Sequence, residues 1–330
     1  MRDTIRLALL FAFVSSFVFS SAQHLKRPAN FGFQPAPVDA NTAKEAGLSE
    51  PRGLMVAGVI PGSTFENAGV QKGDILLSIN GNETNDWPSL VTAKDGLWEG
   101  EKIKLMVWRK KKEKTLTGAM VGKAKETSDR WDVMYDEVPF DNGYLSGIVT
   151  KPKSPGPHPT IYFIPGYTCA TVEALNPIHP YAKFLDSLNA LGYAIFRVDK
   201  PGTGMGPNPC KCAETGFYKE LEVFRAGWDH LQTYDFVDKD QIYIFGHSMG
   251  GFEAPLLAAD PEINPKGVAV YGTAFQSWYE YIINMLRFQE PRNGEDYIEF
   301  EKDMQEYTKL FYEHYALQKP LDKIVSNPTW

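Results

Sequence analysis

The stretch that decides the fold is Ile242-Tyr243-Ile244-Phe245-Gly246-His247-Ser248-Met249-Gly250-Gly251. Its first four residues are apolar or aromatic and predict a buried strand, and an Ala- and Leu-rich helix is expected from Gly250 to Ala259. The glycines on either side of Ser248 let the backbone turn so tightly that the serine hydroxyl projects from the end of the sheet. The pattern therefore predicts an exposed serine between a strand and a helix N-terminus.

Strand and helix patterns alternate on both sides of this turn. Such alternation is typical of a mainly parallel sheet with helices on its faces, so we expect an α/β fold here. We expect strands at residues 131–138, 144–150, 160–164, 193–198, 242–245 and 267–271, and helices at 181–190, 217–233, 250–259, 275–289 and 297–317.

In this context Gly246-His247-Ser248-Met249-Gly250 resembles the nucleophile elbow of the α/β-hydrolase family. The resemblance implies that Ser248 is a nucleophile that forms an acyl-enzyme. It also implies two backbone N–H donors for an oxyanion, one on Met249 and one on Tyr167. Tyr167 ends Pro165-Gly166-Tyr167, where the family often has His-Gly-x, so the histidine is missing but the amide is retained.

Two further segments resemble parts of that family. Asp199-Lys200-Pro201-Gly202-Thr203-Gly204 is similar to the loop that shapes the floor of the site, which makes Asp199 a structural residue and not the acid of a triad. The helices at about 275–318 resemble a cap that closes over the pocket. The implied architecture is a mainly parallel sheet with a helical cap.

A serine nucleophile needs a base, and the base needs an orienting acid. In the family both follow the serine, but the one histidine after Ser248 is His314, in an aromatic helical segment that favours a packed or exposed role. No carboxylate directly follows strand 267–271, and Leu321–Trp330 resembles the approach to a seventh strand. We therefore expect an inactive fragment with an unpaired sheet edge, its last strands, acid and histidine lying beyond Trp330.

The N-terminal third has a different pattern, with short strands separated by glycine-rich turns. Pro61 to Gly81 reads P-G-S-T-F-E-N-A-G-V-Q-K-G-D-I-L-L-S-I-N-G and resembles a bacterial PDZ domain of the kind attached to exported proteases. Phe31, Gly32 and Phe33 are similar to the carboxylate-binding loop of that family, which implies a nest of N–H groups for a peptide C-terminus, beside a strand edge open to β-addition. The alternative is that the two phenylalanines are core residues and the domain binds nothing.

These resemblances divide the chain. We expect a small, mainly-β PDZ-like domain at 28–122, a polar linker at 123–130 and an incomplete α/β-hydrolase domain at 131–330. Residues 1–22 have the charge, apolar run and small residues of a signal peptide, so the mature protein is expected in the periplasm or outside the cell, and not in a membrane. An uncleaved anchor is the alternative.

Composition excludes some partners and leaves others open. The formal net charge is −7 and the cationic run Arg109-Lys110-Lys111-Lys112 is expected at a hairpin tip, so no nucleic acid partner is expected. A disulfide from Cys169 to either Cys210 or Cys212 is plausible in an exported protein. No cofactor is expected and no metal, because C-x-C without a nearby histidine is not a zinc pattern.

The leading interpretation is an exported serine hydrolase that cleaves a carboxylic ester or related acyl compound, with a PDZ module that binds a peptide or protein partner. A serine peptidase of the prolyl type is one alternative, because its outline is similar and its substrate would be a peptide. A PDZ scaffold with a degenerate, non-catalytic hydrolase half is the other.

Overall fold

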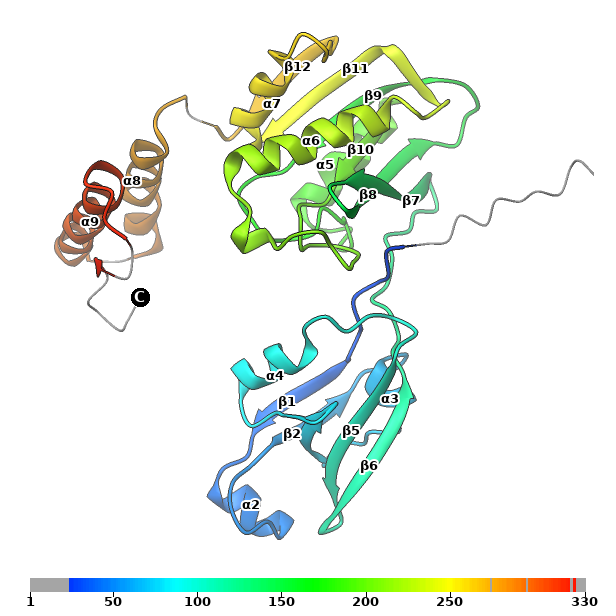
Figure 1. Cartoon of the computed structure of the whole chain (residues 1–330), viewed down its shortest axis with the longest axis vertical. Coiled ribbons are helices and arrows are strands. Elements are labelled where there is room, and N and C mark those ends of the chain that lie inside the picture. Colours follow the sequence, from blue (N-terminus) through cyan, green and yellow to red (C-terminus); the bar gives the residue numbers. More distant parts are fainter. Residues whose placement is uncertain (1–23, 274, 295, 321–322, 325–330) are drawn as a thin grey trace, which may run out of the picture. The chain divides into compact units, whose positions relative to one another are not determined.

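The computed structural model describes residues 24–273, 275–294, 296–320 and 323–324. The predicted signal peptide lies outside these residues, as does nearly all of the predicted approach to a seventh strand. The described chain forms two compact units, which meet in sequence at Tyr271 and Gly272, and each is considered by itself (Figure 1). Among the described helices, none combines the length and apolar character needed to cross a membrane.

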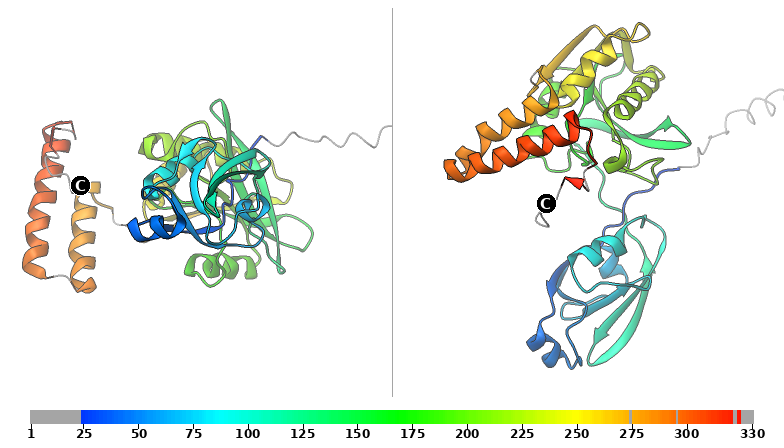
Figure 2. Two further views of the ribbon diagram at one scale, coloured as in Figure 1. Left: turned by 90° about the horizontal axis from the view of Figure 1, so that it is seen from below. Right: turned by 60° about the vertical axis from the view of Figure 1, so that its left-hand side comes forward.

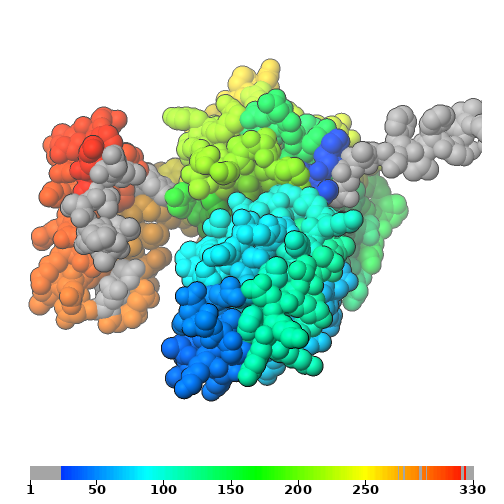
Figure 3. Space-filling view, turned by 60° about the horizontal axis from the view of Figure 1, so that its bottom comes forward, coloured from blue at the N-terminus to red at the C-terminus, as the bar shows by residue number. Residues whose placement is uncertain are grey.

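The N-terminal module of the first unit is a six-stranded sheet in the order β1-β2-β3-β5-β6, with β4 beside β3. It occupies the blue to blue-green surface in Figure 3. Its elements are β1 (Phe33–Pro37), α2 (Ala40–Ala46), β2 (Leu54–Val59), α3 (Thr64–Asn67), β3 (Ile75–Ile79), β4 (Asn82–Glu83), α4 (Trp87–Lys94), β5 (Lys102–Arg109) and β6 (Lys112–Ala119).

Local signals determine several of these boundaries. Asp86 caps α4 by accepting a hydrogen bond from the Ser89 amide, and the Ser89 hydroxyl accepts in return from the Asp86 amide, which forms a capping box. Lys110 and Lys111 have positive φ and are exposed at the tip of the β5–β6 hairpin, where the cationic run is expected. Arg109, at the end of β5, instead pairs with the buried Asp74 at 2.6 Å.

The second part of this unit is a mixed sheet in the order β12-β11-β9-β10-β8-β7. β9, β10, β11 and β12 pair in parallel, while β7, β8 and the β8–β10 pair are antiparallel. Its elements are β7 (Trp131–Phe140), β8 (Gly143–Pro152), β9 (His158–Ile164), α5 (Pro180–Ala190), β10 (Ala194–Val198), η1 (Cys212–Glu214), α6 (Phe217–Leu231), β11 (Val237–His247), α7 (Gly250–Ala258) and β12 (Gly267–Tyr271).

Helices cover both faces of this sheet. The larger core joins α6 and α7 to alternate residues of the strands, among them Tyr162 and Phe196. The neighbouring strand residues Phe163 and Ile195 face the other way and pack against Leu185 of α5. Period-two alternation in the buried strands therefore places one helix layer on each face, which confirms the predicted α/β class.

Strand β12 forms one edge of the sheet. Among the described residues it pairs with β11 alone, and the side chains of Val268, Val270 and Tyr271 are exposed. An exposed apolar edge agrees with the unpaired edge expected from the sequence.

The second unit is a helical pair. It contains α8 (Trp278–Gln289), η2 (Glu290–Asn293), α9 (Tyr297–Phe311) and the π-helical turn η3 (Tyr312–Ala316). α8 and α9 lie side by side in both views of Figure 2, and Ile283, Phe300 and Met304 form a small buried core between them. The two predicted helices are confirmed, and their role as a cap stays a prediction.

Candidate active site

Ser248 lies at the turn between β11 and α7 with its backbone in the left-handed region, at φ +54°. That conformation is costly for a residue with a side chain and persists only where the surroundings enforce it. The surrounding glycines show what enforces it: a Cβ on Gly246 would lie 2.2 Å from the Gly250 carbonyl oxygen, and a Cβ on Gly250 would lie 2.4 Å from the Ile164 carbonyl oxygen. The strand, turn and helix are thus packed too closely for any other residue at these positions.

The two residues predicted to supply oxyanion donors belong to segments that adjoin Ser248. Met249 is the N-cap residue of α7, and helix N-terminal amides have no intrahelical acceptor. Tyr167 lies on the loop after β9, which closely approaches the elbow: a Cβ on Gly166 would be 2.9 Å from the Ser248 Cβ. The structure therefore brings the β9 loop, Ser248 and the start of α7 together.

A pocket of about 510 Å³ opens beside Ser248. Its walls are mostly apolar and come from the loop after β9, the start of α5 and the end of β11. The lining residues include Phe163, Gly166, Tyr167, Thr171, Val172, Glu173, Leu175, His179, Ala182, His247 and Ser248. This volume and character suit a small organic substrate.

Two histidines line this pocket, and neither contacts a carboxylate among the described residues. The ring of His247 stacks on Tyr271, and Nδ1 of His179 accepts a hydrogen bond from the Tyr181 amide at the start of α5. The histidines that do contact a carboxylate, His24 with Glu137 and His230 with Asp136, do not line the pocket. His314 belongs to the second unit, where its Nδ1 lies 3.0 Å from the Lys319 carbonyl oxygen.

Asp199 holds the loop that forms the pocket wall. Its buried carboxylate accepts hydrogen bonds from the Val172 amide at 2.8 Å and the Thr171 hydroxyl at 3.3 Å, and also from the Ser146 hydroxyl. Burial raises the pKa of Asp199, while these hydrogen bonds lower it. Asp199 thus serves the structural role that the sequence predicts.

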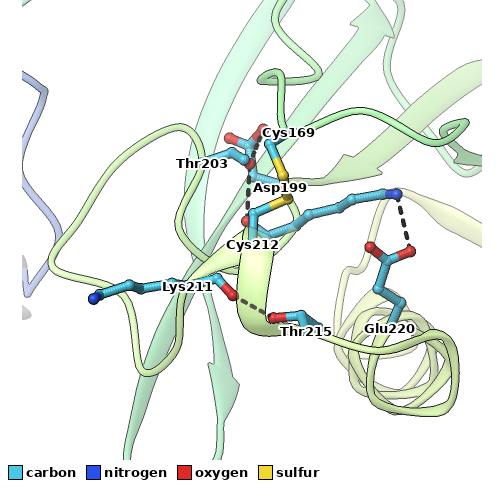
Figure 4. The surroundings of a disulfide bond; sticks show 8 residues. Cys169, Asp199, Thr203, Lys211, Cys212, Thr215 and Glu220 are labelled. Carbon is cyan, nitrogen blue, oxygen red and sulfur yellow. Dashed lines mark hydrogen bonds and ion pairs between the residues drawn. A yellow bond between two sulfur atoms is a disulfide. The ribbon is translucent and has the colours of Figure 1, made fainter. Parts of the chain in front are cut away.

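A disulfide joins Cys169 to Cys212, with their Cα atoms 5.7 Å apart (Figure 4). It ties the loop after β9 to the loop after β10, beside Asp199 and Thr203. Of the two pairings that the sequence allows, the structure selects Cys212 and leaves Cys210 as a half-buried free thiol. The loop after β9, which forms the wall of the pocket, is therefore covalently attached to the loop after β10.

Replacing both Cys169 and Cys212 by serine is expected to lower the free energy of unfolding by about 3 kcal/mol. The bridge closes a segment of 43 residues, and its loss frees that segment in the unfolded chain. Urea unfolding without reductant measures the change. Cys210→Ser is the control and should retain native stability; an unchanged double variant would contradict the expected contribution of the bridge.

In the N-terminal module, the predicted carboxylate loop lies just before β1. Gly32 has φ +61°, and a Cβ there would lie 2.1 Å from the Ser63 Cβ, so the position requires glycine. The rings of Phe31 and Phe33 both contact Phe65, at centroid distances of 5.9 and 4.5 Å. Both phenylalanines therefore contribute to the core, as the alternative interpretation expected, and the glycine supplies the loop geometry.

Residues 29–118 match the family model described as PDZ domain, and residues 177–295 match the model described as Serine aminopeptidase, S33, an α/β-hydrolase family. The chain joins a PDZ domain to an α/β-hydrolase domain. The second match includes Ser248, and the first includes Phe31, Gly32 and Phe33. The two matches thus fall on the two sheets.

Curated relatives match in the PDZ region. The chain is 33% identical over 98 residues to a probable periplasmic serine endoprotease DegP-like of Rhizobium meliloti (strain 1021), covering 29% of this chain and 19% of that protein. Its match to the protein of the same description from Pseudomonas putida (strain GB-1) is 31% over 151 residues, covering 39% and 31%. The chain therefore spans less than a third of either relative.

Among solved structures, the chain is similar to Est1E from Butyrivibrio proteoclasticus with ferulic acid bound. The identity is 28%, the match covers 41% of this chain and 50% of that one, and the TM-score is 0.34. A putative dipeptidyl aminopeptidase IV from Bacteroides ovatus matches at 18% identity over 51% of this chain and 25% of that one, with a TM-score of 0.36.

Glu173, in the wall of the pocket beside Ser248, is a residue that the sequence does not single out. Its carboxylate forms a two-pronged ion pair with Arg27, at 2.6 and 3.2 Å, and both side chains are almost fully buried. Arg27 also donates to the carbonyl oxygens of Lys123 and Ala124. One arginine thus joins the segments before and after the PDZ domain to the wall of the hydrolase pocket.

A second unpredicted group lies under the elbow. Glu253 on α7 is fully buried, and neither of its carboxylate oxygens has a hydrogen-bond partner among the described residues. Nearby, Lys200 and Glu220 form a buried ion pair at 2.9 Å. Burial, and then repulsion from Glu220, raise the pKa of Glu253 to about 9, against the opposing effect of Lys200. The helix that follows Ser248 therefore carries a neutral carboxylic acid at neutral pH.

Native stability is expected to fall as pH rises from about 5 to 9, and Glu253→Gln should reduce that fall. In the unfolded chain the carboxyl ionises near 4.5, whereas in the folded chain it stays protonated up to about 9, so unfolding releases a proton throughout this window. Between pH 6 and 8 the native chain should lose about 2 kcal/mol more than the variant. Urea unfolding at both pH values measures this, with the exposed Glu45→Gln as control; equal losses would show that Glu253 is ionised in the folded chain.

Proposed function

We propose that this protein is an exported serine hydrolase that cleaves a carboxylic ester or related acyl compound through an acyl-enzyme on Ser248. The observation that carries the proposal is the backbone of Ser248, held at φ +54° between glycines that tolerate no side chain. Strained backbone conformations cluster at functional sites. Here Ser248 lines a pocket of about 510 Å³, which suits a small organic substrate. The DegP-like periplasmic relatives support export.

In the proposed reaction the Ser248 oxygen attacks the substrate carbonyl carbon while a base takes its proton. The carbonyl oxygen becomes an oxyanion, which the amides of Met249 and Tyr167 stabilise. Each such donor contributes about 100- to 1,000-fold in rate in other hydrolases. Departure of the alcohol leaves the acyl group on Ser248, and water then releases the acid and regenerates the serine.

The pocket favours a neutral, apolar acyl group. Phe163, Val172, Leu175 and Ala182 supply apolar wall. Among the described lining residues Glu173 is the one carboxylate, and Arg27 already neutralises it. A cationic substrate group would therefore enter this pocket without a counter-charge, at a high desolvation cost.

A serine aminopeptidase is the second candidate, because the family model that matches the hydrolase domain carries that description. An aminopeptidase must receive the free α-ammonium of a peptide, so the neutralised Glu173 counts against it. A matched pair of substrates, alanine p-nitroanilide and N-acetylalanine p-nitroanilide, separates the two. Preference for the free amine would favour the aminopeptidase.

Acylation of Ser248 tests the proposal. No histidine–carboxylate pair faces Ser248 among the described residues, so the chain is incubated with p-nitrophenyl acetate in the presence of imidazole as an added base. Intact and peptide mass spectrometry should find one acetyl group, on Ser248, and Ser248→Ala should abolish it. Ser154→Ala, at an exposed serine, is the control and should be acetylated like the native chain.

Failure of Ser248 to acquire the acetyl group, with or without imidazole, would overturn the proposal and favour the non-catalytic scaffold. Acetylation that survives in Ser248→Ala would likewise show that another group reacts.

For the PDZ domain we propose that the loop at Phe31–Phe33 binds the free carboxylate of a peptide or protein partner. Gly32 in the left-handed region orients successive backbone N–H groups in the way that anion-binding nests require.

A further inference from the structure

Strand β1 is an edge strand whose outward-facing groups can be assigned. The Ile60 amide donates to the Gly32 carbonyl oxygen, which places Gly32 towards β2 and the next residue, Phe33, outward. Further along, Pro35 lies opposite Val56. The amide and carbonyl of Val56 bond to Asp74 and Gly73, away from β1, so the groups of Pro35 also face away, towards the open edge.

The open edge therefore lacks most of the backbone N–H donors that strand addition uses. Residues two apart in a strand face the same way, so Pro37 faces outward with Pro35. Proline has no N–H group, and its ring occupies the place where a partner carbonyl would approach. An added strand could use the donor of Phe33 but would find none at the next two outward positions. The edge is open, as the sequence predicts, but it cannot form a continuous ladder.

The loop at Phe31 and Gly32, next to the start of β1, differs from this edge because it has free backbone donors. Within the described residues the amides of Phe31 and Gly32 donate no hydrogen bond. The ammonium of Lys94, at the end of α4, lies over the ring of Phe31 at 5.4 Å and over that of Trp87 at 5.7 Å. The cation thus contacts the side chain of one of the two residues whose amides are free.

The Lys94 ammonium has no carboxylate counter-ion among the described residues. It forms no ion pair with a described carboxylate, and neither does Lys123. Burial and then repulsion from Lys123 lower the pKa of Lys94, so an anion placed there would relieve both. A cleft of about 530 Å³ begins here, lined by apolar and charged residues that include Phe31, Trp98, Leu175, Lys94, Lys123, Asp95 and Glu173. Arg27 already pairs with Glu173. This volume lies within the range of small-molecule sites.

We propose that the PDZ domain binds only the last one or two residues of a chain end, holding the carboxylate between the Phe31–Gly32 amides and Lys94, and that Pro35 and Pro37 exclude an extended peptide strand. The inference rests on the proposed carboxylate loop and specifies which ligand that loop takes. A short acid with an apolar side chain fits the two lysines and the apolar residues Phe31, Trp98 and Leu175 of the cleft.

Binding as a function of ligand length tests the proposal. NMR titration of the full chain would compare N-acetylvaline, N-acetylleucine and N-acetylphenylalanine with longer peptides that end in the same residues, and with the corresponding C-terminal amides. In an ordinary strand addition each main-chain hydrogen bond tightens binding by about two- to tenfold. Here the dissociation constants of the N-acetyl amino acid and the longer peptide should agree within about threefold. The ligands with a C-terminal amide should bind at least about tenfold more weakly than the acids.

Variants separate the two parts of the proposal. Pro35→Ile with Pro37→Ile restores two outward donors and should tighten the longer peptides by about tenfold while leaving the N-acetyl amino acids unchanged. Ala36→Ile, whose backbone faces β2, is the control and should not change the dependence on length. Lys94→Met should weaken every carboxylate ligand by about tenfold or more, whereas the exposed Lys72→Met should not.

The outcomes distinguish the inference from the function on which it rests. If native protein binds the longer peptide tenfold or more tightly than the single residue, the loop binds a carboxylate but the exclusion by proline is wrong. If no acid binds in preference to its amide, the carboxylate loop itself is wrong. Unchanged binding in Lys94→Met would overturn the role of that lysine.

Discussion

Replacing Arg27 by methionine is expected to lower the free energy of unfolding by about 3–5 kcal/mol, the usual cost of removing one partner from a buried ion pair. Methionine keeps the apolar stem but leaves the Glu173 carboxylate buried without its cation, and the carbonyl oxygens of Lys123 and Ala124 without their donor. The Tyr135 hydroxyl would then be the remaining side-chain donor to Glu173. Urea unfolding measures the loss.

Two controls show whether the loss comes from the unpaired charge. Lys26→Met removes the neighbouring cation, which forms an exposed pair with Glu101 at 3.5 Å, and should cost less than about 1 kcal/mol. Adding Glu173→Leu to Arg27→Met removes the buried carboxylate and should recover most of the lost stability. A double variant no more stable than Arg27→Met would show that packing, and not charge, accounts for the effect.

Gly250→Ala is expected to slow acylation of Ser248 by about 100-fold, the usual consequence of misplacing reacting groups by about 1 Å. The new Cβ would lie 2.4 Å from the Ile164 carbonyl oxygen and 2.6 Å from that of Pro165. Both are backbone atoms in the middle of the site, so the elbow must move away from the β9 loop that carries the Tyr167 amide. The rate of labelling by a fluorophosphonate, followed by mass spectrometry, measures the effect.

Gly267→Ala is the matched control. Gly267 also lies in the sheet, on the neighbouring strand β12, but a Cβ there would meet only the Tyr243 ring, at 3.5 Å or more. Labelling and stability should both stay near native values. If Gly250→Ala labelled Ser248 at the native rate, close packing of the elbow would not be what positions the serine.

Features encoded over a few residues could be predicted from the sequence. The elbow depends on glycines within two residues of Ser248, and the bounds of α4 depend on the cap formed by Asp86 and Ser89. Both signals act through backbone geometry and hydrogen bonds between residues close in the chain. They can therefore be recognised in the sequence without knowledge of the tertiary structure. The strand–helix alternation extends the same reasoning to the whole sheet.

Features that depend on distant partners could not be predicted. Arg27 and Glu173 are 146 residues apart, and nothing in either local pattern distinguishes them from other surface charges. The choice of Cys212 over Cys210 required the relative positions of two loops. Pro35 and Pro37 look like linker residues in the sequence, and only the register with β2 shows that they face the open edge.

The sequence by itself therefore determined that the chain has a serine at a strand–helix turn, an α/β sheet around it and a PDZ-like module before it. The tertiary structure decided what surrounds Ser248, which charges are neutralised in its pocket, and which backbone groups the PDZ edge can offer. The physical reason is that turns and caps are satisfied by neighbours in the chain. Burial, ion pairing and strand register are instead satisfied by residues that only folding brings together.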